Sequence, residues 1–248
     1  MKETCIFISD LHLGLQSFED ERKKERLVEE LLIKIKPEVT KLFILGDLFD
    51  YWFEYRKVTQ RGFFRLFTAL QDLTDAGVEV HYLIGNHDFM HRDFFEKELG
   101  VKLYKDPVEM IIEGKKFFLA HGDGLVKNDT GYKILKVILR NKFLQWFYSL
   151  VHPDFGIWIA SSMSKGSRDY TSEKNYGEED GLIESATNKI KSGFDYVIMG
   201  HTHNRIHKKI DNGEYINLGT WIVKPCYGLY KDGKFEILNW KENGEIFK

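Results

Sequence analysis

Leu42-Phe43-Ile44-Leu45-Gly46-Asp47 indicates the fold most clearly, because a short apolar run ends in a glycine followed by a carboxylate. In four more places, a short run rich in Ile, Phe and Tyr ends directly before a side chain that can bind a metal ion. These are Cys5–Ser9 before Asp10, His81–Gly85 before Asn86, Phe117–Ala120 before His121, and Tyr196–Gly200 before His201. Such runs predict buried strands. In three of the five, a glycine before the polar residue permits an unusual backbone turn. Five strand ends are therefore expected to direct polar side chains to one edge of a sheet.

The segments between these strands complete the prediction of the fold. Apolar residues at helical spacing predict helices at 19–36, 62–76 and 178–191. Turn signals predict hairpins at Glu113–Lys115, Asp211–Gly213 and Asp232–Gly233. We expect one α/β domain over residues 1–248, with a mixed sheet or two sheets packed face to face and helices on the outside.

The composition excludes several classes of protein. The 248 residues are 43% hydrophobic and 30% charged, which excludes disordered and fibrous chains. Thirty-six Lys and Arg against 38 Asp and Glu leave a net charge of −2, so no broad nucleic-acid-binding surface is expected. The two cysteines form no CxxC pair, which argues against a disulfide scaffold and a thiolate zinc site. Nine histidines are present, and five of them fall in short motifs.

The distribution of apolar residues predicts a cytoplasmic protein. Only Met1–Thr4 precede the first apolar run, and no secretory cleavage site follows it. The longest stretch without Lys, Arg, Asp or Glu is 143–153, about half of the roughly 20 residues that a membrane helix needs.

Two pairs of the form X-x-His extend the set of polar strand ends, namely Asp10-Leu11-His12 and His201-Thr202-His203. Residues i and i+2 of an extended segment face the same way, so each pair can present two ligands together. The expected ligands are Asp10, His12, Asp47, Asn86, His121, His201 and His203. Seven exceed the needs of one catalytic zinc ion and suit two ions that share a carboxylate.

The donor atoms of this set indicate both the metal and the reaction. Imidazole, carboxylate and amide donors favour Mn, Fe or Zn over Mg or Ca, and we take Mn²⁺ as the first expectation. Two divalent ions about 3.5–4 Å apart would clamp a phosphoryl group and lower the pKa of a water between them. The expected chemistry is hydrolysis of a phosphoester or a phosphoanhydride.

The series Asp10-x-His12, Gly46-Asp47, Gly85-Asn86-His87-Asp88, His121 and Gly200-His201-Thr202-His203 resembles the calcineurin-like metallophosphoesterases. The resemblance implies that Asp10, His12, Asp47 and His203 hold one ion. It implies that Asp47, Asn86, His121 and His201 hold the other, with Asp47 bridging. His87 and Asp88 would be catalytic, His87 facing the phosphate and Asp88 orienting its ring. Asp50 and Asp123 are either ligands or partners of ligands.

A segment at 129–175 interrupts the motifs with many large apolar side chains and Pro153 near its middle. It predicts two helices that form a hairpin inserted in the domain as a lid. Such a hairpin is either a buried helical pair or a wall of a pocket for lipid chains.

The whole chain resembles the UDP-2,3-diacylglucosamine pyrophosphatases of lipid A biosynthesis. The supporting stretches are Gly46–Trp52, His121–Asp123, Asp129–Tyr132 and the insertion. The resemblance implies that water attacks the α-phosphorus of UDP-2,3-diacylglucosamine, giving UMP and 2,3-diacylglucosamine 1-phosphate. By position, the implied substrate contacts are Asn86, His87, Asp129, Tyr132, Ser167, Thr171, Lys174 and His201. The best-known members have Arg where this chain has His87, which follows the general superfamily pattern.

Two alternative functions remain at this point. A broader phosphodiesterase or nuclease could use the same site, although the apolar insertion lacks the basic and aromatic alternation typical of single-strand grooves. A non-enzymatic binding module is the second. Peripheral contact with the cytoplasmic face of the inner membrane is a further hypothesis, since Lys133, Lys136, Arg140 and Lys142 flank the apolar hairpin. A solvated helical face explains these lysines and arginine equally well, and nothing in the sequence indicates the oligomeric state.

Overall fold

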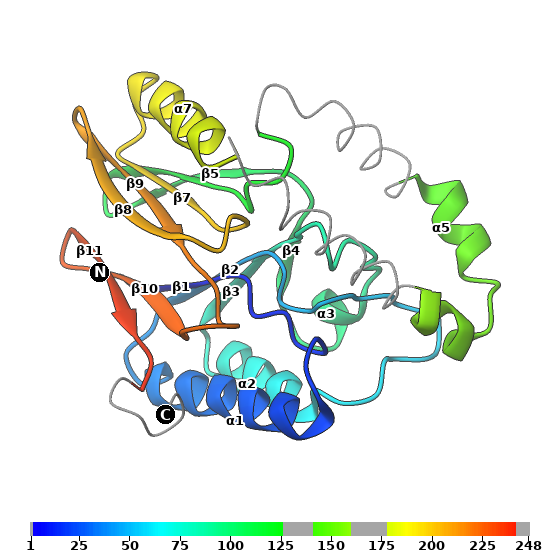
Figure 1. Cartoon of the computed structure of the whole chain (residues 1–248). Coiled ribbons are helices and arrows are strands. Elements are labelled where there is room, and N and C mark those ends of the chain that lie inside the picture. Colours follow the sequence, from blue (N-terminus) through cyan, green and yellow to red (C-terminus); the bar gives the residue numbers. More distant parts are fainter. Residues whose placement is uncertain (1, 126–140, 160–177, 242–248) are drawn as a thin grey trace.

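The architecture has four layers, with two β-sheets face to face and helices on both outer sides (Figure 1). The computed structural model describes residues 2–125, 141–159 and 178–241. Helices α1 and α2 cover one sheet and α7 covers the other (Figure 1). Of the two arrangements that the sequence predicts, the structure has the pair of facing sheets.

The first sheet is mixed and has the order β11-β10-β1-β2-β3-β4. Its parallel part runs from β1 to β4: β1 Thr4–Ile8, β2 Lys41–Leu45, β3 Glu79–Leu83 and β4 Lys102–Tyr104. Two antiparallel strands extend it beyond β1: β10 Cys226–Lys231 and β11 Lys234–Asn239. The turn between β10 and β11 is at the predicted Asp232-Gly233.

The second sheet is also mixed, with the order β5-β6-β7-β9-β8. Its strands are β5 Val108–Ile112, β6 Lys115–Leu119, β7 Tyr196–Met199, β8 Arg205–Ile210 and β9 Gly213–Leu218. β6, β7 and β9 are parallel, whereas β5 and β8 are antiparallel edge strands. The predicted hairpins at 113–115 and 211–213 join β5 to β6 and β8 to β9.

The helices follow local signals in the sequence. Their bounds are α1 Phe18–Ile35, α2 Phe64–Asp75, α3 Phe94–Lys97, α5 Lys142–Tyr148 and α7 Glu178–Lys191. The side chain of Ser17 caps α1 by accepting a hydrogen bond from the Asp20 N–H. Gly77 follows α2 with φ of +86°, the left-handed conformation that commonly ends a helix. The three predicted helices are confirmed, with ends shifted by a residue or two for α1 and α2.

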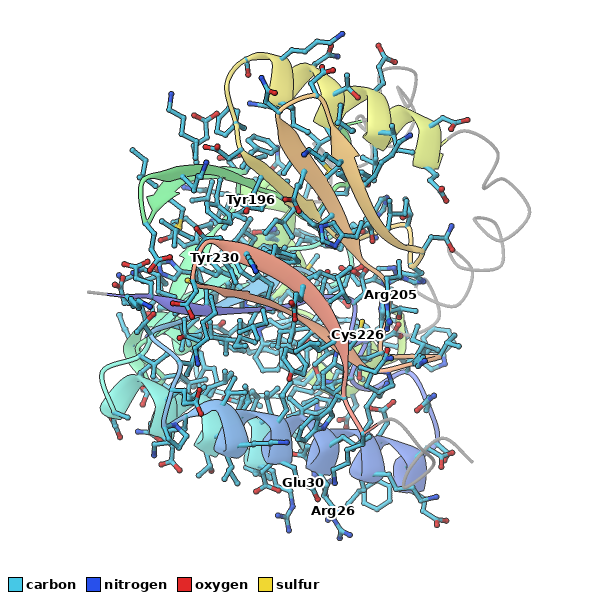
Figure 2. All side chains as sticks on the ribbon, turned by 90° about the vertical axis from the view of Figure 1, so that its left-hand side faces the viewer. Arg26, Glu30, Tyr196, Arg205, Cys226 and Tyr230 are labelled. Atoms are coloured by element: carbon cyan, nitrogen blue, oxygen red, sulfur yellow. The ribbon has the colours of Figure 1, made fainter. Side chains whose placement is uncertain are left out.

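The space between the sheets is filled by aromatic side chains. Phe7 stacks on Phe43 with ring centroids 4.8 Å apart, and it faces Phe117 of the second sheet at 6.3 Å. Tyr196 of β7 and Tyr230 of β10 also meet between the sheets, at 5.4 Å (Figure 2). Because successive strand side chains point to opposite faces and both faces are covered, the central strands β1, β2 and β7 are apolar along most of their length. The parallel strands of both sheets therefore end at one shared edge.

The predicted insertion lies partly outside the described residues. Within 141–159, α5 is followed by a second helical segment at 153–159, with a short break between them. α5 has no buried residue, and Phe143 and Trp146 are more than half exposed. In this part, the apolar side chains do not form a buried helical core. None of the helices within the described ranges has the length and apolar character needed to cross a bilayer.

His91 makes the stability of the fold sensitive to acid. Its ring is buried between Trp52, Tyr82 and Phe95, and neither ring nitrogen has a hydrogen-bond partner among the described residues. Burial, together with the Lys105 charge, lowers the pKa of His91 to about 3, although the backbone of Asp88 opposes the shift. The folded state thus keeps the ring neutral where the unfolded chain protonates it.

We expect His91→Phe to weaken this dependence on pH. Below the unfolded pKa of about 6.5, the wild type should lose up to about 1.4 kcal/mol per pH unit through His91, down to its folded pKa. Phenylalanine keeps a planar aromatic ring at this position and removes the titration. Urea unfolding of both proteins at pH 8, 6 and 5 measures the difference, since other groups affect both alike. Parallel stability curves would contradict the assignment.

Candidate metal centre

The seven predicted ligands lie together at the shared edge of the two sheets. Asp10, Asp47, Asn86, His121 and His201 each follow the end of a strand, in β1, β2, β3, β6 and β7 respectively. His12 and His203 come two residues after Asp10 and His201. Both sheets contribute, so the centre exists only where they meet.

The first group of donors surrounds Asp10. Nε2 of His203 lies 3.4 Å from Oδ1 of Asp10, and Nε2 of His12 lies 3.1 Å from Nε2 of His203. Nε2 of His12 is also 3.7 Å from Oδ2 of Asp47. The donor atoms of Asp10, His12 and His203 all lie within 4.8 Å of one another, as a single cation requires.

The second group surrounds Asn86 and His121. Nε2 of His121 lies 3.3 Å from Oδ2 of Asp47 and 2.9 Å from Oδ1 of Asn86. Nδ1 of His201 lies 3.0 Å from the same Asn86 oxygen. Oδ2 of Asp47 thus faces both His12 of the first group and His121 of the second. This position suits a carboxylate that bridges two ions.

The backbone at the centre differs from the sequence prediction. The X-x-His pairs were expected to be extended, but φ is +54° at Asp10, +46° at His12, +74° at His201 and +60° at His203. Asp47 has φ of +50°. The prediction that extended geometry orients these pairs is wrong. In each pair, both residues have left-handed backbone conformations, which turn the chain tightly. Each side chain therefore reaches the centre from a separate turn of the backbone.

Two of the three motif glycines also act differently from the expectation. Gly46 has φ of +87°, as an unusual turn requires, but Gly85 and Gly200 do not have positive φ. A Cβ on Gly85 would lie less than 3.0 Å from Asp47, and one on Gly200 less than 3.0 Å from Asp10. These two glycines are needed because the ligands pack directly against the backbone.

A set of buried polar groups orients the ligands. Nδ1 of His121 lies 2.7 Å from the Leu45 carbonyl, which leaves Nε2 free to face Asp47. Asn217 of β9 donates to the Gly200 carbonyl at 2.6 Å, and the Thr220 hydroxyl donates to the Asp10 carbonyl at 3.0 Å. Sequence reasoning missed Asn217 and Thr220. The signal for Asn217 was a polar residue within the apolar run Tyr215–Leu218.

The electrostatics of the centre indicate a site for positive charge. Burial raises the pKa of Asp47, but the neighbouring histidines lower it more, so it lies well below its usual value. Burial lowers the pKa of His121, but the Asp47 carboxylate raises it far more. Without metal, the centre therefore holds a proton on His121 to balance its buried carboxylates. A divalent cation can replace that charge and release the proton.

Two further histidines are prepared for binding a cation. Burial lowers the pKa of His12, and burial together with the His121 charge lowers the pKa of His201 to about 4. Both rings are neutral at pH 7 and keep a nitrogen lone pair. The donor set therefore fits divalent metal ions. Asp123 is buried, and its charge raises the pKa of both His121 and His201, consistent with a partner of the ligands.

His87 lies beside the first group, with its ring centroid 4.9 Å from that of His12. Asp88 was expected to orient this ring, but Nδ1 of His87 lies 3.0 Å from the Asp50 carbonyl. The Asp88 carboxylate instead accepts hydrogen bonds from the Tyr82 hydroxyl and from backbone N–H groups, including those of Gly85 and Leu48. Asp50, not Asp88, contacts the His87 ring, and Asp88 joins the loops that carry Asp47 and Asn86.

Asp50 has a second contact, because its Oδ1 lies 3.6 Å from Nδ1 of His12. This supports its expected role as a partner of a ligand. The predicted substrate contacts in the insertion lie outside the described residues: Asp129, Tyr132, Ser167, Thr171 and Lys174. Of the basic residues predicted to flank the hairpin, Lys142 is described, and Lys133, Lys136 and Arg140 are not.

Comparison with known proteins agrees with this geometry. The sequence profile of calcineurin-like phosphoesterases matches residues 4–205. A UDP-2,3-diacylglucosamine hydrolase from Porphyromonas gingivalis is 32% identical, covering 99% of this chain and 100% of the relative. Another from Nitrosococcus oceani is 30% identical, covering 87% and 86% respectively. The solved structure of an archaeal phosphodiesterase shares the fold, with a TM-score of 0.50, 15% identity, and coverage of 95% of this chain and 99% of that one. The chain belongs to the calcineurin-like phosphoesterase family.

Proposed function

We propose that this protein hydrolyses UDP-2,3-diacylglucosamine by attack of water on the α-phosphorus, releasing UMP and 2,3-diacylglucosamine 1-phosphate. The observation that carries the proposal is the pair of donor groups that share Asp47, in a chain with UDP-2,3-diacylglucosamine hydrolases as relatives along its length. The paired donor groups account for hydrolysis at phosphorus. The relatives support the choice of substrate.

The metal is part of this proposal. Asp10, His12, Asp47 and His203 would hold one ion, and Asp47, Asn86, His121 and His201 the other, with Mn²⁺ preferred and Fe or Zn as alternatives. When bound, two divalent ions activate water and neutralise charge on a transferring phosphoryl group. The protein's own contribution is to keep these donors in place.

His87 is the residue that we assign to the leaving group. Its backbone N–H donates to Oδ1 of Asp47 at 2.9 Å, which ties it to the shared carboxylate. The Asp50 carbonyl lies 3.0 Å from Nδ1 of His87 and can accept a hydrogen bond from an N–H there, which leaves Nε2 to face the substrate. From there it can donate a proton to the leaving phosphate oxygen as the bond to the α-phosphorus breaks.

The described part of the insertion supports a lipid substrate. α5 and the segment after it expose large apolar side chains, namely Phe143, Leu144, Trp146, Phe147, Leu150, Phe155 and Trp158. A soluble protein rarely exposes so many large apolar groups together without an apolar ligand or surface for them. They would cover the acyl chains of the substrate, and they would allow peripheral contact with the cytoplasmic face of a membrane.

The substrate assignment is tested by measuring UMP release from UDP-2,3-diacylglucosamine in the presence of Mn²⁺. The same assay is run with deacylated UDP-glucosamine and with a single-stranded oligonucleotide. We expect efficient hydrolysis of the acylated substrate alone. Equal rates on the deacylated sugar would remove the role of the lipid, and cleavage of the oligonucleotide would favour a broad phosphodiesterase.

Asp47→Ala should reduce the bound metal and abolish hydrolysis. The shared carboxylate contributes to both donor groups, so its loss should weaken both ions. Metal content after desalting is measured by mass spectrometry, with circular dichroism to check the fold. The control is Asp211→Ala, at the exposed turn between β8 and β9. Full metal content and activity in Asp47→Ala would exclude the bridging role.

His87→Ala should slow turnover while the bound metal stays at the wild-type level. General acid catalysis typically contributes about 10²–10⁴-fold, so kcat should fall within that range. The matched control is His152→Ala, whose side chain is exposed on the insertion. Unchanged kcat would remove His87 from the reaction, and loss of metal would make it a ligand instead.

A further inference from the structure

A cavity of about 470 Å³ lies between α5 and the loops of the core, apart from the donors of the metal centre. Phe53 and Glu54 of the loop after β2, and Met90 and His91 of the loop after β3, line its core side. Lys142 and Trp146 of α5 line the other side. The two core loops are joined, because the Glu54 N–H donates to the Met90 carbonyl at 3.1 Å. This volume lies in the range of small-molecule sites.

The cavity wall carries four cationic side chains from separate segments of the chain: Arg56, Arg92, Lys105 and Lys142. Three of them, Arg56, Arg92 and Lys142, form no ion pair within 4.0 Å in the part of the chain that the structure describes. Lys142 belongs to α5 and the other three belong to the core. Cationic side chains thus line the cavity from both sides of the junction, and an anion bound there would be attracted by both.

The two acidic residues of the wall are already engaged elsewhere. The buried carboxylate of Glu54 accepts hydrogen bonds from the backbone N–H groups of Arg92, Asp93 and Phe94, at 3.0, 2.8 and 2.8 Å. Asp93 pairs with Lys97 at 2.6 Å. Neither carboxylate pairs with the cations of the cavity.

The inner wall holds a polar group without a partner. His91 is only 6% exposed, and neither of its ring nitrogens has a hydrogen-bond partner among the described residues. A neutral imidazole carries one N–H that can donate to an anionic oxygen. Guanidinium groups bind phosphate with paired hydrogen bonds, and a phosphate monoester carries nearly two charges at pH 7.

We propose that this cavity is a phosphate-binding site separate from the metal centre. Arg56, Arg92 and Lys142 supply the charge, and His91 supplies a donor at the inner wall. The phosphate belongs either to a free phosphate compound or to the headgroup of a phospholipid beside the exposed aromatic side chains of α5. The proposal does not depend on the proposed function, because none of these residues is a donor of the metal centre.

The test uses acetylation of Lys142 in the metal-loaded enzyme, followed by peptide mass spectrometry. The probes are inorganic phosphate, phosphatidylglycerol vesicles and phosphatidylcholine vesicles. At a probe concentration ten times its Kd, about a tenth of the sites are empty. The rate of acetylation of Lys142 should therefore fall about tenfold. Lys208 and Lys209, exposed on β8, report non-specific effects.

Variants separate this site from the metal centre. In the double variant Arg56→Gln/Arg92→Gln, the probe should lose most of its protection of Lys142 against acetylation. The charge-matched control Lys208→Gln/Lys209→Gln should keep this protection. Asp47→Ala should keep it too, because that change affects only the metal centre. Protection by inorganic phosphate identifies a free phosphate compound, and protection by phosphatidylglycerol vesicles alone identifies a lipid headgroup.

Two results would overturn the proposal. One is Lys142 acetylation that neither phosphate nor phosphatidylglycerol slows relative to Lys208 and Lys209. The other is equal protection in the wild type and in Arg56→Gln/Arg92→Gln, which would show that the cavity cations do not bind the probe. Circular dichroism of the double variant shows whether its fold is intact, which is expected because both arginines are exposed.

Discussion

The candidate centre depends on a backbone that turns sharply at the ends of parallel strands. Five of its seven donor residues have positive φ, which side chains other than glycine adopt only at a cost of roughly 1–2 kcal/mol each. Such strain persists only where the surrounding structure enforces it. Here the two packed sheets enforce it. Gly200 packs against Asp10 of the other sheet, and Gly85 packs against Asp47 at the end of the neighbouring strand, so neither glycine has room for a Cβ.

This arrangement places opposite charges at close range inside the protein. Asp10 and Asp47 are buried, and His121 provides positive charge beside them in the absence of metal. Burial of two carboxylates so close together is unfavourable unless cations accompany them. The centre thus favours divalent ions. The orientation of His121 by the Leu45 carbonyl further prepares it for binding.

The sequence predicted those features that depend on short segments. Each strand and its terminal polar residue lie within six consecutive positions. The strands, the two facing sheets as one of two alternatives, and the meeting of seven candidate donors at one edge could therefore be predicted. The orientation of the donors could not, because left-handed φ at Asp10 and His201 arises from contacts between distant strands. For the same reason the sequence associated His87 with its neighbour Asp88, whereas the fold brings Asp50 to the ring.

The insertion adds a second kind of surface to this chemistry. α5 exposes aromatic side chains and also lines a basic cavity, with Trp146 common to both, so an apolar and an anionic group could bind near each other. The account as a whole still depends on two ions held by one shared carboxylate. Anomalous diffraction from crystals grown with Mn²⁺ tests this most directly. We predict two peaks about 3.5–4 Å apart, both next to Asp47. A single peak, or two peaks of which only one lies next to Asp47, would contradict the account.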